Sequence, residues 1–306
     1  MYRRAPRPVK SAAWLLVALA LCGPALAQDL GERLERSRDL EAELDHLTSV
    51  LVEGRAGEVL RAVGDLADEV RGDARWANLH GLALAATGDH RAAVQRYTEG
   101  LRLDPHRPEL HTNLAVSLVA LGATGRALSE FEQATELDPG SVDAHLGWGR
   151  ELHRLRRHES ALQPLLRARE LAPDDRRVLV VLGEAAAAAG RTDLALEAWR
   201  RAERVDPDVR SARRVAELLA PDDPEAAIEA YDRCVGRDPE ALECREAAAS
   251  LERRLGRPEA AVERLLDVAE LISPAALEIL FQALLESRGT DAVVELAGRR
   301  TPSTAT

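Results

Sequence analysis

Two cysteines close together in the sequence carry the clearest chemistry of this chain. Cys234 and Cys244 flank an Asp238-Pro239 pair, which is typical of a break between two helices. If one cysteine ends a helix and the other begins the next, antiparallel packing brings their sulfurs within bonding range. In an oxidising compartment such a pair forms a disulfide, and so short a loop would stabilise the fold by about 2–3 kcal/mol. Two buried free thiols are the alternative interpretation.

The histidines offer only fragments of a metal or catalytic site. His158 and Glu159 begin like the H-E-x-x-H motif of zinc proteases, but Leu162 stands where the second histidine is required. His111 and His145 are 34 residues apart and could meet at metal-binding distance, although packing between helices is the simpler role. A phosphate-binding loop needs a lysine, and the chain has only one, near its N-terminus. We therefore predict no catalytic residue, no metal site and no cofactor.

These residues lie in a sequence that repeats every 34 positions. The spacing holds for four prolines, namely Pro105, Pro139, Pro173 and Pro207. Three further columns keep the same step: Gly81, Ala115, Gly149 and Gly183; Ala93, Ala127, Ala161 and Ala195; and Tyr97, Phe131, Leu165 and Trp199. A period of this length indicates stacked supersecondary units, which offer a long continuous surface instead of a catalytic pocket.

Each repeat is predicted to contain two helices joined by a turn. In one repeat, apolar residues recur at helical spacing at Leu114, Leu118 and Leu121. Glycines, which readily adopt positive φ, lie between the two helical stretches at Gly88, Gly122 and Gly190. Asp-Pro pairs at 104–105, 138–139 and 206–207 then end the second helix. The pattern predicts an array of helix–turn–helix units.

The columns resemble the tetratricopeptide repeat, whose pattern is W-x2-L-G-x2-Y, then A-x3-F, then P. The second repeat reads His111-x2-Leu114-Ala115-x2-Leu118, Ala127-x3-Phe131, Pro139. The third reads His145-x2-Trp148-Gly149-x2-Leu152, Ala161-x3-Leu165, Pro173. The opening tryptophan of the family pattern is missing from every repeat. The resemblance implies an all-α fold, a right-handed α-solenoid of antiparallel helix pairs.

The columns also predict where the repeats begin and end. Four regular repeats are expected at residues 74–209, after a lead-in at 28–39 and a degenerate first repeat at 40–73. A shortened repeat at 210–241, a further repeat at 242–275, capping helices at 276–299 and a disordered tail at 300–306 complete the chain. The capping region carries an apolar stripe at Leu277, Leu280, Phe281, Leu284 and Leu285. We interpret the stripe as a cap on the last repeat, with a dimerisation surface as the alternative.

The first 27 residues have the pattern of a secretory signal peptide. Four basic residues precede an apolar run at 12–21, and Ala25-Leu26-Ala27 then offers a cleavage site after Ala27. We predict a periplasmic or secreted protein with no transmembrane segment after cleavage. An uncleaved anchor is one alternative. Lipid anchoring at Cys22 is another, but Leu21 stands where a lipoprotein signal requires a small residue.

The charge of the chain argues against nucleic-acid binding. It has 41 Lys and Arg against 52 Asp and Glu, a net charge of −11, and loss of the signal peptide would make it more acidic. Phosphate contacts require concentrated positive charge. Abundant alanine and arginine, with a single lysine, are typical of a bacterium with a GC-rich genome.

The resemblance implies that the first helix of each repeat lines a groove that holds a peptide or a partner's helix. The expected groove residues are Asn78, Leu82, Thr112, Asn113, Val116, Arg150, His153, Arg154 and Arg177. Arginines suit carboxylate recognition, so we expect a partner segment with acidic and apolar residues. The alternative is that these arginines pair with the chain's own acids. Asn113 is the only residue that matches a position of the family's clamp for C-terminal carboxylates. The predicted repeats contain no lysine that could complete such a clamp.

These observations predict a non-enzymatic scaffold or adaptor of the bacterial cell envelope. It would bind a protein or peptide partner in its groove and assist assembly of an envelope or secretion complex. The alternative is a self-associating structural protein of the periplasm, which forms oligomers through its C-terminal helices.

Overall fold

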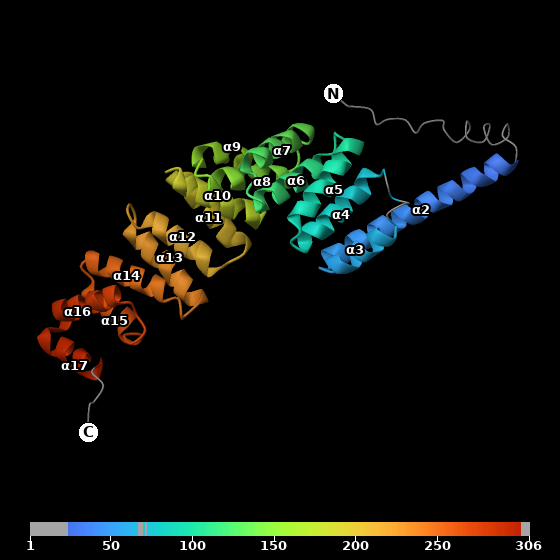
Figure 1. Ribbon diagram of the computed structural model, residues 1–306. Coiled ribbons are helices and arrows are strands. Elements are labelled where there is room, and N and C mark those ends of the chain that lie inside the picture. Colours follow the sequence, from blue (N-terminus) through green and yellow to red (C-terminus); the bar gives the residue numbers. More distant parts are fainter. Residues whose placement is uncertain (1–23, 67–69, 71, 301–306) are drawn as a thin grey trace, which may run out of the picture. The chain divides into compact units, whose positions relative to one another are not determined.

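The computed structural model describes residues 24–66, 70 and 72–300, which form helices and short turns with no strand among them (Figure 1). Within these residues, no helix combines the length and the apolar character needed to cross a bilayer. Most of the predicted signal peptide, including Cys22, and residues 301–306 of the predicted tail lie outside the described ranges. The helices form two compact units, one ending at Leu137 and the other beginning at Asp138. We call them unit 1 and unit 2.

Unit 1 is built from antiparallel helix pairs. Its helices are α2 (Pro24–Val52), α3 (Ala56–Asp65), α4 (Ala74–Ala86), α5 (His90–Leu103), α6 (Pro108–Ala120) and α7 (Thr124–Leu137). In Figure 1, α4 lies against α5 and α6 against α7. The long helix α2 runs through the predicted lead-in, so residue 40 does not mark the start of an element. Its C-terminal half packs on α3 through Leu47 and Val50, which are buried.

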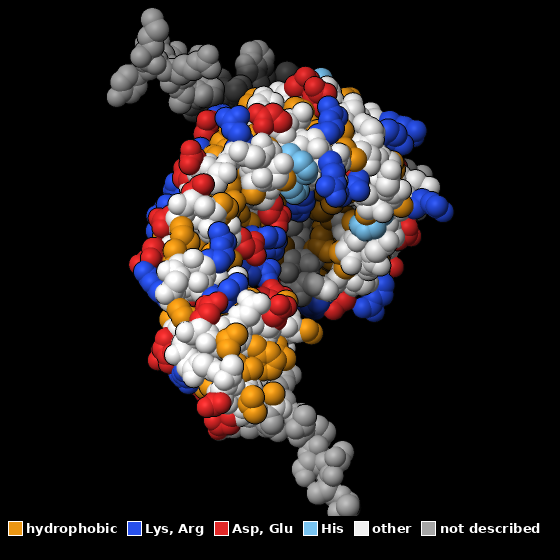
Figure 2. Space-filling model, turned by 90° about the vertical axis from the view of Figure 1, so that its left-hand side faces the viewer, with side chains coloured by type: hydrophobic (Ala, Val, Ile, Leu, Met, Phe, Trp, Pro, Cys, Tyr) orange, Lys and Arg blue, Asp and Glu red, His pale blue; other side chains and the backbone are white. Residues whose placement is uncertain are grey.

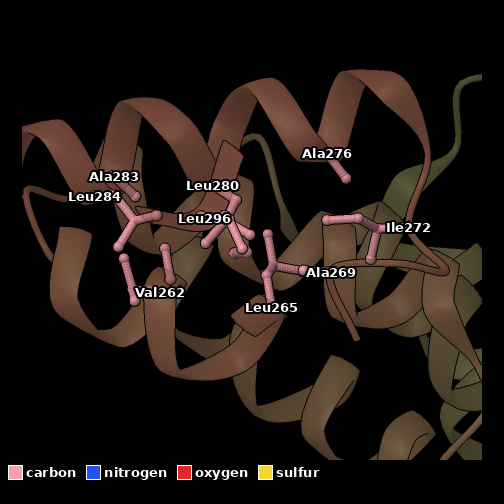
Figure 3. Close-up of a cluster of buried hydrophobic side chains, with 11 residues drawn as sticks. Val262, Leu265, Ala269, Ile272, Ala276, Leu280, Ala283, Leu284 and Leu296 are labelled. Atoms are coloured by element: carbon pink, nitrogen blue, oxygen red, sulfur yellow. The ribbon is translucent and has the colours of Figure 1, made fainter. Parts of the chain in front are cut away.

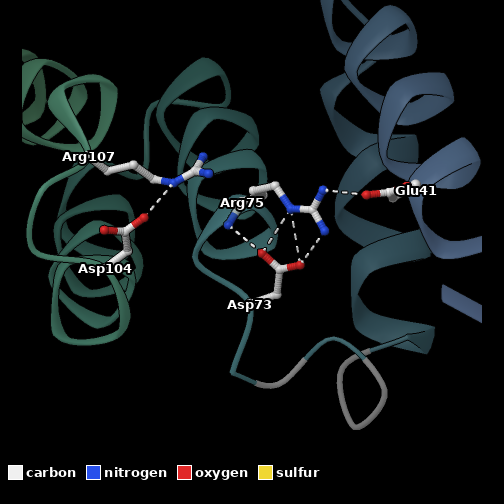
Figure 4. A network of polar contacts seen from close by, with 5 residues as sticks. All are labelled: Glu41, Asp73, Arg75, Asp104 and Arg107. Atoms are coloured by element: carbon white, nitrogen blue, oxygen red, sulfur yellow. Dashed lines mark hydrogen bonds and ion pairs between the residues drawn. The ribbon is translucent and has the colours of Figure 1, made fainter. Parts of the chain in front are cut away.

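An ion-pair network joins α2 to the start of α4 in unit 1. The carboxylate of Asp73 accepts a hydrogen bond of 2.8 Å from the backbone N–H of Arg75, which caps the N-terminus of α4. The Arg75 guanidinium also reaches Glu41 of α2 at 3.1 Å (Figure 4). Burial raises the pKa of Asp73, but the hydrogen bonds from Arg75 outweigh it and leave that pKa below its usual value.

Unit 2 continues the pairing over ten helices. They are α8 (Val142–Arg154), α9 (His158–Leu171), α10 (Arg176–Ala188), α11 (Thr192–Val205), α12 (Val209–Leu219), α13 (Pro224–Arg237), α14 (Leu242–Arg254), α15 (Pro258–Leu266), α16 (Pro274–Arg288) and α17 (Thr290–Arg300). The helix α12 has 11 residues, whereas α8 and α10 have 13 each. The shortening falls in the repeat that the sequence predicted to be short.

The C-terminal stripe packs inward over part of its width. Leu280 and Leu284 of α16 are buried against Val262 and Leu265 of α15, as Figure 3 shows. This packing covers the last repeat, which is what a solenoid end requires. Leu285, one residue further along α16, remains 52% exposed.

The turns between paired helices use the left-handed region of backbone space. Gly88, Gly122 and Gly190 have φ of +87°, +74° and +70°, which glycine adopts without a steric penalty. In the third repeat Arg156 occupies the equivalent place with φ +59°, the one non-glycine residue with positive φ among the described residues. The side chain of Arg156 is exposed, so the main consequence of having arginine instead of glycine at this turn is a strained backbone.

The repeating columns form the contacts between paired helices. Ala93, Ala127, Ala161 and Ala195 are all 0% exposed. The bulky column at Tyr97, Phe131, Leu165 and Trp199 is at most 1% exposed. Tyr97, Leu165 and Trp199 each face the glycine of the partner helix. A Cβ added at Gly183, for example, would lie 2.6 Å from the Trp199 ring. Small residues are therefore needed for the two helices of a pair to approach this closely.

A disulfide joins the last turn of α13 to the first turn of α14. Cys234 and Cys244 are bonded, with their Cα atoms 6.4 Å apart and both side chains almost fully buried. The cysteines therefore lie at the ends of two successive helices, on either side of the Asp238-Pro239 break.

Candidate functional site

The first helices of successive pairs carry all the residues predicted for the groove. In unit 1 these are α4 and α6, which contact each other, and in unit 2 they begin with α8 and α10, which also contact each other. Positive and negative side chains are interspersed over the face of the molecule in Figure 2, so no large patch of one sign stands out there.

In unit 1 the predicted residues form a small polar and apolar surface. The side-chain amide of Asn113 donates a hydrogen bond of 2.9 Å to the Asn78 side-chain oxygen and so joins α6 to α4. Val116 is 50% exposed and Leu82 is half-buried. Thr112 is only 8% exposed, and its hydroxyl donates a hydrogen bond to the Pro108 carbonyl one turn back in the same helix. Thr112 therefore offers a partner little surface, unlike the sequence-based prediction.

In unit 2 two of the three predicted arginines already have acidic partners. The Arg154 guanidinium lies 2.6 Å from the carboxylate of Glu151, whose side chain is buried. Arg177 lies 2.7 Å from Asp175 and 3.1 Å from Asp143. These contacts follow the alternative in which the arginines pair with the chain's own acids. Arg150 differs, because it is exposed and makes no ion pair with any described residue.

The ion pairs of unit 2 also link one first helix to the next. Arg177 of α10 pairs with Asp143 of α8, and Arg210 of α12 pairs with Glu184 of α10. Arg213 of α12 then pairs with Glu243 of α14. The charges of these named pairs therefore neutralise one another, and a partner would have to break the pairs in order to use them.

His153 forms an unusual contact with a second histidine. The Nδ1 atoms of His153 and His158 are 3.0 Å apart, so one ring donates an N–H hydrogen bond and the Nδ1 of the other ring accepts it. Burial lowers the pKa of His153, the nearby His158 lowers it further, and Glu184 opposes both. His153 is therefore held in its neutral form at pH 7.

An open cavity of about 380 Å³ lies beside His153 in unit 2. Residues of three first helices and of α11 line it: His153, Glu184, Ala187, Ala188, Trp199, Arg214, Glu217 and Leu218. Of these, only His153 belongs to the groove predicted from the sequence. No sequence signal marks the others, because alanine is the last residue of α4 and of α6 as well as of α10.

The two histidines of the tryptophan column have a structural role. In unit 1 the Nε2 of His111 lies 3.1 Å from the Pro105 carbonyl, and in unit 2 the Nε2 of His145 lies 3.3 Å from the Pro139 carbonyl. Each ring thus hydrogen-bonds the proline that closes the preceding repeat, six residues earlier. Among the described residues, no group of three or more His, Cys, Asp or Glu side chains could hold a metal ion.

The sequence columns and the helix pairs both match a known family. The model of the tetratricopeptide repeat matches residues 78–142, 112–176, 146–210 and 216–276. The chain belongs to the tetratricopeptide repeat family. Tetratricopeptide repeats indicate a protein–protein interaction scaffold, and proteins built from them are generally non-enzymatic. None of the curated protein sequences compared with this chain is similar enough to count as a relative.

Solved tetratricopeptide repeat structures share the fold. The crystal structure of YrrB, a TPR protein with an unusual peptide-binding site, superposes with a TM-score of 0.53 at 22% identity; the match covers 60% of this chain and 95% of YrrB. The pilF protein of Pseudomonas aeruginosa gives 0.52 at 20% identity over 74% of this chain and 97% of its own. At these identities the similarity establishes the fold alone.

Three buried or half-buried histidines predict that the protein becomes less stable in mild acid. Burial is the first cause of the lowered pKa of His80, His145 and His153. Between the folded-state pKa and the unfolded value of about 6.5, the unfolded chain binds more protons, so stability falls as pH falls. We expect a lower urea midpoint, followed by circular dichroism, at pH 5.5 than at pH 7.5. His145→Gln should reduce this difference, whereas His46→Gln at an exposed site should not. A midpoint that rises in acid would contradict this assignment.

Proposed function

We propose that this protein is a non-enzymatic scaffold of the bacterial cell envelope that holds a segment of a partner protein on the first helices of unit 2. In this role it would assist assembly of an envelope or secretion complex. The observation that carries the proposal is the open cavity between α8, α10 and α12. It lies on the helices that tetratricopeptide repeats present to peptides, and YrrB, which shares the fold, has a peptide-binding site.

The proposed location rests on the sequence of the N-terminus. A basic start, an apolar run and Ala25-Leu26-Ala27 support export, and a disulfide between Cys234 and Cys244 suits an oxidising compartment. Cell fractionation of the source organism tests this part of the proposal. Recovery of the full-length chain with its first residues intact, in the cytoplasm, would contradict it.

Site-specific cross-linking tests the binding surface. We would place photoreactive benzoylphenylalanine at Arg150, which is exposed on the first helix α8 and makes no ion pair with the described residues. The matched control carries the same group at Arg200, which is exposed on the second helix α11. We expect a cross-linked partner protein, identified by mass spectrometry, from position 150 only. Equal cross-linking from both positions, or from position 200 alone, would contradict docking on the first helices.

Self-association is a second candidate, which one observation favours. An apolar cavity of about 280 Å³ opens between α16 and α17, beside Leu285 and Val294, which are 52% and 69% exposed. Figure 2 shows hydrophobic side chains gathered close to the C-terminal end of the chain. Light scattering over a range of concentrations tests this candidate. A mass that rises with concentration and returns to that of a monomer in Leu285→Asp would favour it, and a constant monomer mass would remove it.

A further inference from the structure

We infer that the cavity between α8, α10 and α12 receives a bulky, uncharged side chain of the partner segment, so that unit 2 recognises its partner by shape and apolar burial instead of by charge. This inference rests on the proposed function, because it specifies the chemistry of the partner that binds the same surface.

Small side chains at the end of α10 form part of the lining of the cavity. Ala187 and Ala188 are exposed in the last turn of α10. One repeat earlier, 34 residues before them, the corresponding positions of α8 carry His153 and Arg154. The absence of long side chains on α10 leaves a hollow with His153 on one side and Leu218 of α12 on the other. Ala187, Ala188 and Leu218 form the apolar part of its lining.

The size of the cavity suits a large side chain. An apolar cavity of about 150 Å³ is enough to hold a benzene ring. The cavity of about 380 Å³ can therefore accept the whole side chain of Phe, Tyr, Trp or Leu. Trp199, which is 1% exposed, is also among the lining residues.

The charged residues of the lining are already neutralised. Glu184 pairs with Arg210, which also lies over the Trp199 ring at 5.9 Å. Glu217 lies 2.6 Å from Arg214 and 3.5 Å from Arg213. The remaining ionisable lining residue, His153, is hydrogen-bonded to His158. A charged partner residue entering here would gain no free counter-charge and would lose its hydration. An uncharged side chain meets neither cost.

The matched substitutions Ala188→Trp and Ala120→Trp test the inference. Ala188 is the last residue of α10 and Ala120 is the last residue of α6, and both are exposed, but only Ala188 lines the cavity. The tryptophan at position 188 should fill the cavity and exclude the partner's side chain. Both full-length variants would first be compared with the original chain by circular dichroism, and their helix content should be unchanged.

The probe is a displayed library of short random peptides, selected on the full-length original chain. We expect the enriched peptides to share one bulky apolar residue. Their affinity, measured by fluorescence anisotropy, should fall about tenfold or more in Ala188→Trp, as for an interface hot spot, and should be unchanged in Ala120→Trp. Raising the salt concentration to about 0.5 M, where surface charges are screened, should change the affinity little.

The outcomes separate this inference from the proposed function. Peptides enriched in acidic residues, whose affinity collapses in salt, would overturn the inference but would leave a peptide-binding scaffold. Full affinity in Ala188→Trp would do the same, because the peptide would then bind elsewhere. A library that yields no enriched peptide would contradict both the inference and the proposed function.

Discussion

Replacing Gly183 with alanine is expected to lower the free energy of unfolding of unit 2 by about 1–3 kcal/mol, the usual cost of overpacking a well-packed core. The added Cβ would lie 2.6 Å from the indole of Trp199, which is 1% exposed, so the ring or the helix would have to shift. Alanine is a better helix former than glycine by about 1 kcal/mol, so the steric cost must exceed this gain. We expect it to do so, because the indole is rigid and almost fully buried.

The same substitution at Gly236 is the matched control. Gly236 also lies in a helix of unit 2, but a Cβ there would meet nothing within 4 Å. Gly236→Ala should therefore raise stability by up to about 1 kcal/mol through helix propensity. The measurement compares the urea midpoints of the two variants, followed by circular dichroism. The midpoint is used because a free energy of unfolding is well defined only for two-state unfolding, which repeat arrays do not always show. Stabilisation by both substitutions would show that α10 and α11 approach each other less closely than described.

The columns could be predicted from sequence because each one corresponds to a single physical requirement. Gly183 has to be small where Trp199 is large, and the same pairing recurs at Gly81 with Tyr97. A turn that needs positive φ selects glycine at Gly122. The same requirements recur in successive helix pairs, so the pattern read in one repeat can be checked against the others. The fold and the family followed from this redundancy.

The candidate site could be predicted only in part, because it depends on features that do not repeat. Arg154 has spacing suited to a groove, yet the direction of its side chain toward the buried Glu151 is a matter of local geometry. Thr112 has the right register but bonds to its own helix. The cavity itself results from two alanines at the end of α10, and the sequence gives small residues no sign that they border a hollow. Division of the array at residue 137 likewise has no marker in the columns.

Histidine in place of the family's opening tryptophan shows how the structure changes the meaning of a pattern. Judged by spacing alone, His145 and His111 could together bind a metal ion. In the structure each ring hydrogen-bonds the carbonyl of the proline that closes the previous repeat, so a polar side chain joins successive repeats within each unit. The proline column and the histidine column are thus coupled in two repeats, a relation visible only once the chain is folded.

Removal of the disulfide is expected to cost unit 2 about 2–3 kcal/mol of stability, the loop-entropy contribution of so short a closed loop. The bond links residues 10 apart at the junction of α13 and α14, so its loss should loosen this junction first. The double variant Cys234→Ala, Cys244→Ala removes the bond without placing a polar hydroxyl in a site that is at most 1% exposed. Reductant provides the internal control: it should lower the urea midpoint of the original chain and leave that of the double variant unchanged. If reductant leaves both midpoints unchanged and both thiols of the native protein react with a labelling reagent, the cysteines are free, and the structural argument for an oxidising compartment disappears with the bond.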